Sequence, residues 1–394
     1  MLVQEKVTQA LALLDEFDID CWLTFTRESQ VCGDPTLEFL LGSYVTWHSS
    51  FILSRKLGAI AIVGKYDRAA VEDTGAYSRV ESFVKDYKPH LQDVMREIDP
   101  SSIALNWSVA SEIADGLTHG MYLTLQDVLG EIGMADRFVS SESLVSALRQ
   151  RKTDGELAAI RGAIADTEEV YDLVAGFMRA GRTEREVAAF VAAEFERRGV
   201  DTAWPASSCP AVFAGPNTAE AHYPPTNRVI EPGMVVSMDM GTKRDLYCSD
   251  LQRTFYVLAE GETEAPPEVT KAFAVITESI ERARKAMRPG VTGVSVDAAC
   301  RDYVTSNGHD EFPFAVGHQV GRYSHDGTAL LGPEWEKYGR KVQQPLEPGM
   351  VFTIEPRISV PGRGIVTVED MVMVTEDGAE YISTPQRKLI LIGG

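Results

Sequence analysis

Three things that the sequence lacks narrow the classes of protein to which it can belong. Its 394 residues carry a net charge of −20, so the sequence lacks an excess of positive charge. This disfavours a nucleic-acid-binding protein, because binding to phosphates needs clustered Lys and Arg. Its five cysteines are odd in number and scattered without a C-x-x-C pair, which gives no disulfide framework and indicates a reducing compartment. No uncharged apolar run reaches the length of a membrane span. We therefore expect a cytoplasmic protein with no nucleic-acid or membrane partner.

The composition that remains is typical of a folded chain with two domains. Hydrophobic residues make up 44% and charged residues 24% of the sequence, as in ordinary globular proteins. The length exceeds that of one common domain and suits two. Residues 3–17 interleave apolar and polar positions, which predicts an amphipathic helix and does not suit a signal peptide.

The first 148 residues alternate strand-like and helix-like patterns. Short apolar runs predict strands, and periodic apolar positions predict helices. Strands are expected at residues 21–25, 51–53, 59–63 and 103–105, and helices at 3–17, 87–97 and 109–129. This alternation is typical of α/β architecture, so we predict an α/β domain at residues 1–148.

From residue 149 the pattern changes, first to long helices and then mainly to strands. Helices are expected at residues 154–179, 184–198, 265–287 and 294–306, with Gly199 ending the second of them. Strands are expected at residues 211–213, 235–240, 251–258, 351–355 and 365–374. The second domain, residues 149–394, is therefore predicted to be α+β with a largely antiparallel sheet.

Four acidic residues of this second domain lie in or next to apolar strands. Asp239 ends one strand, Asp250 begins the returning strand, and Glu355 and Glu369 lie in or at the ends of two later apolar runs. A buried carboxylate is costly unless it is paired or binds a metal ion. His318, in a Gly-containing loop, adds an imidazole. Four carboxylates and one imidazole form a ligand set that suits paired Mn, Co, Zn or Fe(II) ions.

Each of these residues taken singly has an ordinary structural interpretation. An isolated Asp or Glu at a strand end is usually a turn residue or the partner of a cation, and a His beside Gly is more often structural than a ligand. Cys248 lies in the same segment, but a nucleophilic Cys needs a partnered base, so we interpret it as a packing residue. Five separate structural explanations for these residues are less satisfactory than one common explanation, so the set as a whole favours a metal site.

The same residues resemble, in order and spacing, the motifs of the pita-bread metallopeptidases, which include methionine aminopeptidase, aminopeptidase P and prolidase. The matching segments are Asp239-Met240-Gly241, Ser249-Asp250-Leu251-Gln252-Arg253-Thr254-Phe255, Gly317-His318, Glu355-Pro356 and Glu369-Asp370. An α/β domain of similar size precedes the catalytic domain in prolidase and aminopeptidase P, and methionine aminopeptidase lacks it. The resemblance is therefore nearer to the creatinase-like, two-domain branch.

The resemblance implies a fold, an activity and a set of ligands. The fold would be a creatinase-like N-terminal α/β domain followed by an α+β pita-bread (creatinase/aminopeptidase) domain. The activity would be that of a metallopeptidase, an Xaa-Pro dipeptidase or Xaa-Pro aminopeptidase. Of two divalent ions per chain, Asp239 would bind one, Asp250 and Glu369 would bridge both, and His318 and Glu355 would complete the other.

Three side chains are expected to take part in the chemistry itself. A hydroxide that bridges the two ions would attack the bond before proline, and Glu355 would pass the proton of water to the leaving nitrogen. His222 and His325 match the family's two substrate-side histidines, and would donate hydrogen bonds to the substrate amide and the developing oxyanion. Because relatives are commonly dimers, the resemblance also implies a homodimer, with manganese among the candidate metals.

Three departures from the family pattern leave the substrate open. The Arg that usually stands two residues before the last Glu is Thr367, a common Tyr after Glu-Pro is Ser359, and a Gly after the ligand His is Gln319. The alternative hypothesis is therefore a metal-dependent hydrolase or lyase of the same fold that acts on a small non-peptide substrate. A third hypothesis, a catalytically dead binding module, is disfavoured because the expected ligands are intact.

Overall fold

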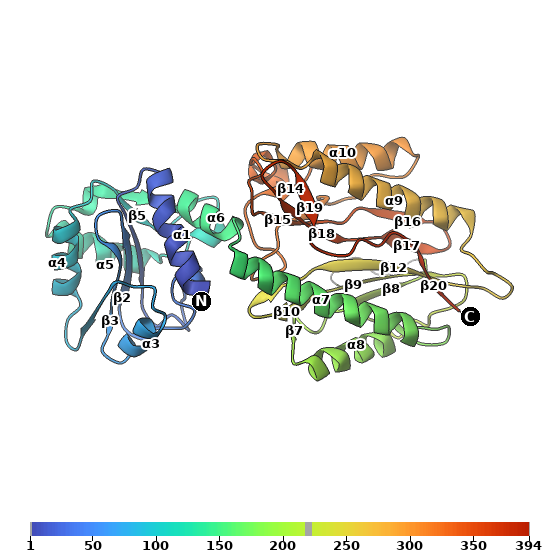
Figure 1. Ribbon diagram of the computed structural model, residues 1–394, viewed down its shortest axis with the longest axis horizontal. Coiled ribbons are helices and arrows are strands. Elements are labelled where there is room, and N and C mark those ends of the chain that lie inside the picture. The colour runs from blue at the N-terminus through green and yellow to red at the C-terminus, as the bar shows by residue number, and fades with distance from the viewer. Residues whose placement is uncertain (1, 217–222, 394) are drawn as a thin grey trace. The chain divides into compact units, whose positions relative to one another are not determined.

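The computed structural model describes residues 2–216 and 223–393. The chain divides into two compact units, residues 1–149 and 150–394, which we call the N-terminal unit and the C-terminal unit (Figure 1). In the described ranges, each helix is either too short or too polar to cross a bilayer.

A six-stranded mixed sheet forms the centre of the N-terminal unit, in the order β4-β3-β2-β1-β5-β6. The strands are β1 (Cys21–Thr26), β2 (Ser49–Ser54), β3 (Gly58–Gly64), β4 (Arg79–Phe83), β5 (Ile103–Leu105) and β6 (Phe138–Ser140). Strand β2 runs antiparallel to both neighbours, and the other pairs are parallel. The sequence did not predict β4 and β6, because these edge strands are not fully buried and carry no continuous apolar run.

Helices cover both faces of this sheet (Figure 1). They are α1 (Leu2–Glu16), α2 (Leu37–Leu40), α3 (Arg68–Asp73), α4 (Lys88–Ile98), α5 (His119–Gly130) and α6 (Glu142–Gln150). Leu23 and Phe25 of β1 pack with α4 and α5, whereas the intervening Trp22, on the opposite face, packs with α1 and α6. Successive side chains of a strand point to opposite faces, so β1 is buried on both sides.

The helix expected at residues 109–129 is shorter than predicted. A 3-10 turn at Glu112–Ala114 comes first, and α5 begins only at His119, where Thr118 caps it by accepting a hydrogen bond from the Met121 amide. Just before the cap, a side chain at Gly116 would lie 2.4 Å from a carboxylate oxygen of Asp34. The chain passes close to this buried acid in the irregular stretch that separates the 3-10 turn from α5.

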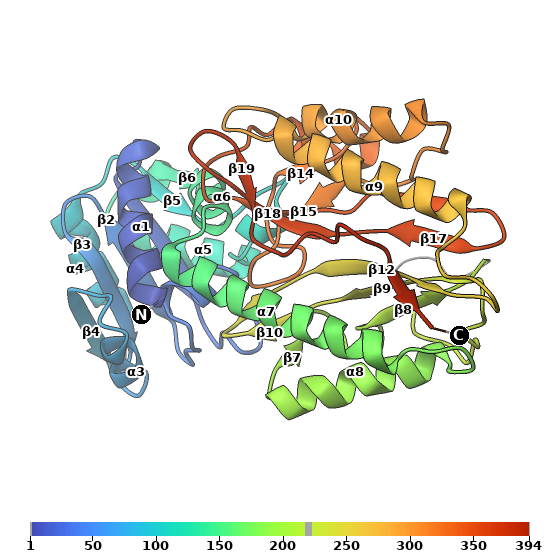
Figure 2. The same cartoon turned by 45° about the vertical axis from the view of Figure 1, so that its right-hand side comes forward.

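Two pairs of helices flank the strands of the C-terminal unit (Figure 2). They are α7 (Asp154–Phe177), α8 (Glu184–Arg198), α9 (Pro267–Ala286) and α10 (Gly293–Ser306). Helices α7 and α8 each begin with a capping box, formed by Thr153 with Glu156 and by Thr183 with Glu186. Helix α8 ends at Gly199, which has a φ of 66°, as the sequence predicted.

The strands between the helix pairs form several short sheets. One has the order β20-β12-β9-β8, a second has β15-β18-β19 and a third is the hairpin of β16 and β17. Their bounds are β8 (Ala211–Ala214), β9 (Val235–Met240), β12 (Leu251–Val257), β15 (Val351–Ile354), β16 (Arg357–Val360), β17 (Gly364–Thr367), β18 (Asp370–Val374), β19 (Ala379–Tyr381) and β20 (Ile390–Ile392). Shorter strands are β7 (Asp201–Thr202), β10 (Thr242–Arg244), β11 (Tyr247–Cys248), β13 (Gly317–His318) and β14 (Leu330–Leu331). Among the described strands of this unit, each pair except β12 with β20 is antiparallel, which confirms the expected character of the sheet.

The single strand expected at residues 365–374 is in fact two strands. Strand β17 pairs with β16, whereas β18 pairs with β15 and β19. At the break, the Glu369 amide donates to the Gln252 carbonyl at 3.1 Å, and the Gln252 amide donates back at 3.4 Å. The chain therefore changes partners at Glu369 while its apolar pattern continues, which the sequence alone did not indicate.

A hydrophobic core holds these strands against α9 and α10. Buried Ile276 and Val296 from the two helices belong to one cluster with Phe352, Val366 and Val372 from the strands. Burying one such side chain fully is worth about 1.5–3 kcal/mol. The core thereby fixes the strand ends on which Glu355 and Glu369 lie.

Candidate metal centre

Asp239 and Asp250 lie on two adjacent antiparallel strands. Asp239 is the fifth residue of β9 and faces Gln252 of β12, while Asp250 immediately precedes β12. The hydroxyl of Tyr171, from α7, donates to the carbonyl oxygens of Met238 and Leu251 at 2.9 and 2.8 Å. This buried tyrosine therefore links the two strands beside the two acidic residues.

Glu355, Glu369 and His318 approach from other strand ends. Glu355 follows β15, and its amide donates to the Val316 carbonyl at 2.7 Å. Glu369 lies between β17 and β18, bonded to β12 through Gln252. His318 is the last residue of β13, and its amide donates to the Thr353 hydroxyl at 3.2 Å.

These five side chains converge, and we call them the five-residue centre: Asp239, Asp250, His318, Glu355 and Glu369. His318 Nε2 lies 3.2 Å from Glu355 Oε1 and 3.8 Å from Asp250 Oδ2. One ligand atom each from Asp250, His318 and Glu369 lie within 4.8 Å of one another. Asp239 lies close enough to Asp250 and Glu355 for the negative charges to act on one another. The structure thus brings together all five residues that the sequence selected as ligands.

The burial of these carboxylates fits cation binding. Burial, followed by repulsion from neighbouring carboxylates, raises the pKa of Asp239, Asp250 and Glu369 well above the ordinary range. Among the described residues, Asp239 Oδ1 and both side-chain oxygens of Glu369 lack a hydrogen-bond donor. Buried oxygens of this kind are expensive to leave without a partner. A divalent cation would supply both the missing partner and the missing positive charge.

The two further histidines selected from the sequence have different outcomes. The His325 ring lies against the His318 ring at a centroid distance of 4.1 Å and an interplanar angle of 85°. It therefore stands at the edge of the five-residue centre. His222 lies outside the described residues, so its role stays a prediction.

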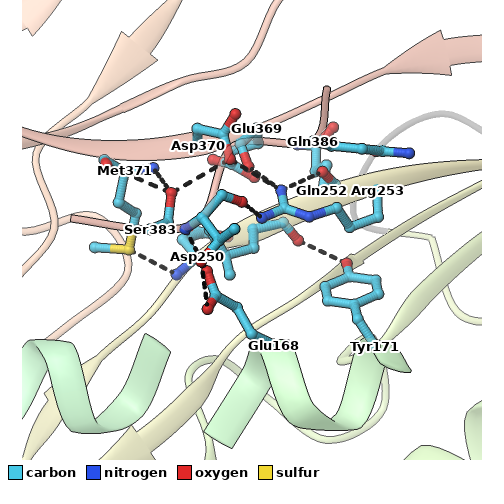
Figure 3. A network of polar contacts seen from close by, with 12 residues as sticks. Glu168, Tyr171, Asp250, Gln252, Arg253, Glu369, Asp370, Met371, Ser383 and Gln386 are labelled. Carbon is cyan, nitrogen blue, oxygen red and sulfur yellow. Dashed lines mark hydrogen bonds and ion pairs between the residues drawn. The ribbon is translucent and has the colours of Figure 1, made fainter. Parts of the chain in front are cut away.

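A buried ion pair between Arg253 and Asp370 lies next to the centre (Figure 3). Arg253 Nη1 lies 3.2 Å from Asp370 Oδ1, and the same guanidinium donates to the carbonyl oxygens of Glu369 and Gln252 at 2.8 and 3.0 Å. Burial raises the pKa of Asp370, and the Arg253 charge opposes that rise. The ion pair thus fixes the backbone on each side of the contact between β12 and Glu369.

The sequence argument did not assign a role to Arg253, Gln252 or Tyr171. The signal that could have indicated the first two is strand alternation, because Asp250 and Gln252 fall on one face of β12 and Arg253 on the other. The role of Tyr171 had no local signal, since it depends on how α7 packs on β9 and β12.

Cys248 is a packing residue, as its sequence context suggested. Its side chain is fully buried, with Sγ 3.3 Å from the Arg322 carbonyl oxygen and 3.7 Å from that of Ala203. Burial raises the pKa of this thiol to about 12, so at neutral pH it is not a thiolate nucleophile.

Comparison with known proteins identifies the family of the chain. Residues 158–376, a range that contains the whole five-residue centre, match the model of metallopeptidase family M24. The chain belongs to metallopeptidase family M24. The enzyme class predicted from the sequence is thereby confirmed, and membership in M24 implies metal dependence.

Individual M24 proteins resemble the chain over most of its length. It is 32% identical over 286 residues to the probable dipeptidase PepE of Mycobacterium tuberculosis, covering 72% of this chain and 70% of the relative. It is 30% identical over 269 residues to the Xaa-Pro dipeptidase of Lactobacillus helveticus, covering 68% of this chain and 69% of the relative. The solved Xaa-Pro dipeptidase from Bacillus anthracis superposes with a TM-score of 0.74 at 25% identity, over 99% of each chain. This full-length match confirms the predicted α/β domain followed by a pita-bread domain.

Proposed function

We propose that this M24 chain is a metal-dependent Xaa-Pro dipeptidase whose five-residue centre binds two divalent ions. The observation that carries the proposal is the convergence of Asp239, Asp250, His318, Glu355 and Glu369, three of whose carboxylates are buried against one another. Because Xaa-Pro dipeptidases are among the relatives, Xaa-Pro dipeptides are the first substrates to test.

The assignment of ligands to the two ions is carried over from the resemblance to the family's motifs. Asp239 would hold one ion, Asp250 and Glu369 would hold both, and His318 and Glu355 would complete the other. When bound there, divalent ions lower the pKa of a shared water and polarise a substrate carbonyl. The carboxylates of Asp250 and Glu369 are almost entirely shielded from bulk water. Electrostatic interactions are stronger in such a buried site than in water.

Glu355 is suited to accept a proton at the substrate side. Its side chain is 17% exposed, compared with 8% for Asp250, so it remains within reach of a substrate. The proton would go from the attacking water to a carboxylate oxygen of Glu355 and from there to the leaving nitrogen. His325, held against the His318 ring, would donate a hydrogen bond to the developing oxyanion.

The test combines metal analysis with three classes of substrate. The purified protein is loaded with Mn²⁺ or Co²⁺ and assayed on Xaa-Pro dipeptides, longer Xaa-Pro peptides and creatine-like amides. We expect two ions per chain and hydrolysis of the dipeptides, both lost in Asp250→Asn. Cleavage of longer peptides in preference to dipeptides would make the chain an Xaa-Pro aminopeptidase instead. A chain that binds no divalent ion would contradict the proposal.

One observation supports the competing activity on a small non-peptide substrate. Thr367, which stands where the family pattern has an Arg, places a neutral hydroxyl 2.7 Å from Gln252 Oε1. The site therefore has no cation at that position with which to bind a substrate carboxylate. Turnover of creatine-like amides together with inactivity on both kinds of proline peptide would favour this second hypothesis.

The assembly and the metal are proposed from the resemblance. We propose a homodimer, to be tested by light scattering of the purified chain at several concentrations. Manganese is the first metal to test, because oxygen-rich sites accept it well. A monomer at all concentrations, or activity with another ion alone, would contradict these two assignments.

A further inference from the structure

Gln252 lies in the middle of the five-residue centre without being one of its ligands. It faces Asp239 across the β9–β12 pair and follows Asp250 by two residues, so it shares a strand face with Asp250. Its backbone exchanges two hydrogen bonds with Glu369. Its backbone position alone therefore places Gln252 next to Asp239, Asp250 and Glu369.

The side chain of Gln252 reaches the fourth carboxylate. Gln252 Nε2 donates to Glu355 Oε2 at 3.0 Å, and Gln252 Oε1 accepts from the Thr367 hydroxyl at 2.7 Å. An ionised carboxylate only accepts, so the amide has to turn its nitrogen toward Glu355 and its oxygen toward Thr367. The Thr367 hydroxyl also lies 3.1 Å from the Pro356 carbonyl oxygen, and the shorter distance of 2.7 Å favours Gln252 Oε1 as the acceptor of its single hydrogen. The result is a hydrogen-bonded row of Thr367, Gln252 and Glu355.

The two carboxylate oxygens of Glu355 have different neighbours. Oε2 is engaged by Gln252, while Oε1 lies 3.2 Å from His318 Nε2. We propose that Gln252 is a positioning residue, which holds Glu355 with Oε1 toward the ions, and that Thr367 in turn holds Gln252. The inference rests on the proposed function, in which Glu355 binds an ion and transfers the proton.

A purely structural role would not account for this arrangement. Gln252 and Glu355 are both partly exposed, so water can replace the hydrogen bond between them in a variant. Such a bond contributes about 1 kcal/mol to folding, whereas the orientation of a metal ligand affects affinity and turnover directly. Variants at Gln252 are therefore expected to fold while their centre works poorly.

The primary test uses Gln252→Leu, which removes both amide groups at similar size, and Gln252→Glu, which places a second acceptor against Glu355. Each should lower kcat by ~10–100-fold, with a smaller change in KM, because partners of metal ligands typically have effects of this size. Calorimetric titration with Mn²⁺ should show ~10-fold weaker binding of at least one ion. Gln92→Leu, at a buried amide of the N-terminal unit that donates to the Val128 carbonyl, is the matched control and should change neither quantity.

Variants at Thr367 separate positioning from folding. Thr367→Val keeps the shape and removes the hydroxyl, so it should show part of the Gln252→Leu defect, and Thr367→Ser should recover most of that loss. The double variant of Thr367→Val and Gln252→Leu should be no worse than Gln252→Leu alone, since both act through one row.

Three results would overturn the inference, and they can be told apart. If the parent binds ions and Gln252→Leu matches it in both titration and kcat, the positioning role alone fails. If the parent binds no divalent ion, the proposed function fails and the positioning role falls with it. Additive losses in the double variant would also contradict the row.

Discussion

The guanidinium of Arg253 lies 3.2 Å from the carboxylate of Asp370, and the two side chains are only 6% and 2% exposed. The same guanidinium holds the carbonyl oxygens of Gln252 and Glu369. One buried positive charge therefore stands next to a group of buried negative charges, on the other face of β12. It compensates Asp370 directly and orders the backbone that carries Glu369.

Breaking this ion pair should strongly reduce the stability of the folded protein. Arg253→Met is expected to lower the free energy of unfolding by about 3–5 kcal/mol, because it leaves Asp370 buried without a counter-charge. Urea denaturation of the metal-free protein measures the change. Arg282→Met is the control: Arg282 pairs with Glu278 on the surface, where such a pair is worth about 0–1 kcal/mol. Equal effects of the two substitutions would contradict the importance of the buried pair.

Asp250→Asn should separate the stability of the protein from its metal binding. Removing one buried like charge should leave the metal-free variant at least as stable as the parent. Mn²⁺ should raise the Tm of the parent and not that of the variant, since ligands stabilise by binding the native state. Turnover should fall by more than ~10²-fold. Replacing a residue that only hydrogen-bonds to a metal ligand usually costs ~10–100-fold, and loss of the ligand itself should cost more. A variant that still gains thermal stability from Mn²⁺ would show that Asp250 is not a ligand.

His325→Gln should reduce turnover while leaving the metal content unchanged. Loss of a hydrogen-bond donor to an oxyanion costs ~10²–10³-fold in kcat, and His325 contacts the ring of His318 without belonging to the five-residue centre. Metal analysis and steady-state kinetics on the same preparation measure both effects. His119→Gln, at an exposed histidine of the N-terminal unit, serves as the control. Loss of bound metal in His325→Gln would instead assign His325 to the ligand set.

Glu281 should make stability depend on acid pH. Hydrogen bonding to Arg284 lowers the pKa of Glu281 from 4.5 to about 2. Because the folded pKa lies below the unfolded one, the stabilisation is complete above about pH 5 and is lost as the pH falls toward 2. Glu281→Gln should therefore cost about 1–2 kcal/mol at pH 7 and progressively less in acid.

The measurement for Glu281 is urea unfolding at several pH values from about 7 down to about 3, which covers the plateau above about pH 5 and much of the loss below it. Glu278→Gln, in an exposed pair with Arg282 on the same helix, is the matched control. A stability difference between Glu281→Gln and the parent that stays constant over this range would mean that the carboxylate charge is not what Glu281 contributes.

Features with a local chemical signal could be predicted from the sequence. Helix α8 has a capping box at Thr183 and a left-handed Gly199 at its end, so its bounds agree with the prediction. Asp239 and Asp250 flank a short reversal between two apolar runs, which was enough to expect them side by side. Both cases depend on neighbours in the sequence.

Features that depend on long-range register could not be predicted. The break at Glu369 arises because β17 and β18 pair with different strands, and the apolar pattern runs through it unchanged. The contact of Gln252 with Glu355 likewise requires β12 and β15 to have found their final places. Thr367 was noticed as a departure from a family pattern, but its hydrogen bond to Gln252 is visible only in the folded chain.

The distribution of the five-residue centre along the chain has a consequence for synthesis in the cell. Asp239 and Asp250 lie at two adjacent antiparallel strands and are synthesised before Glu355 and Glu369. A cation that arrived before residue 369 had been made would find an incomplete set of the side chains that we propose as its ligands. Tight binding would therefore wait until β15 and β18 have formed, and a bound ion would then link these strands to β9 and β12.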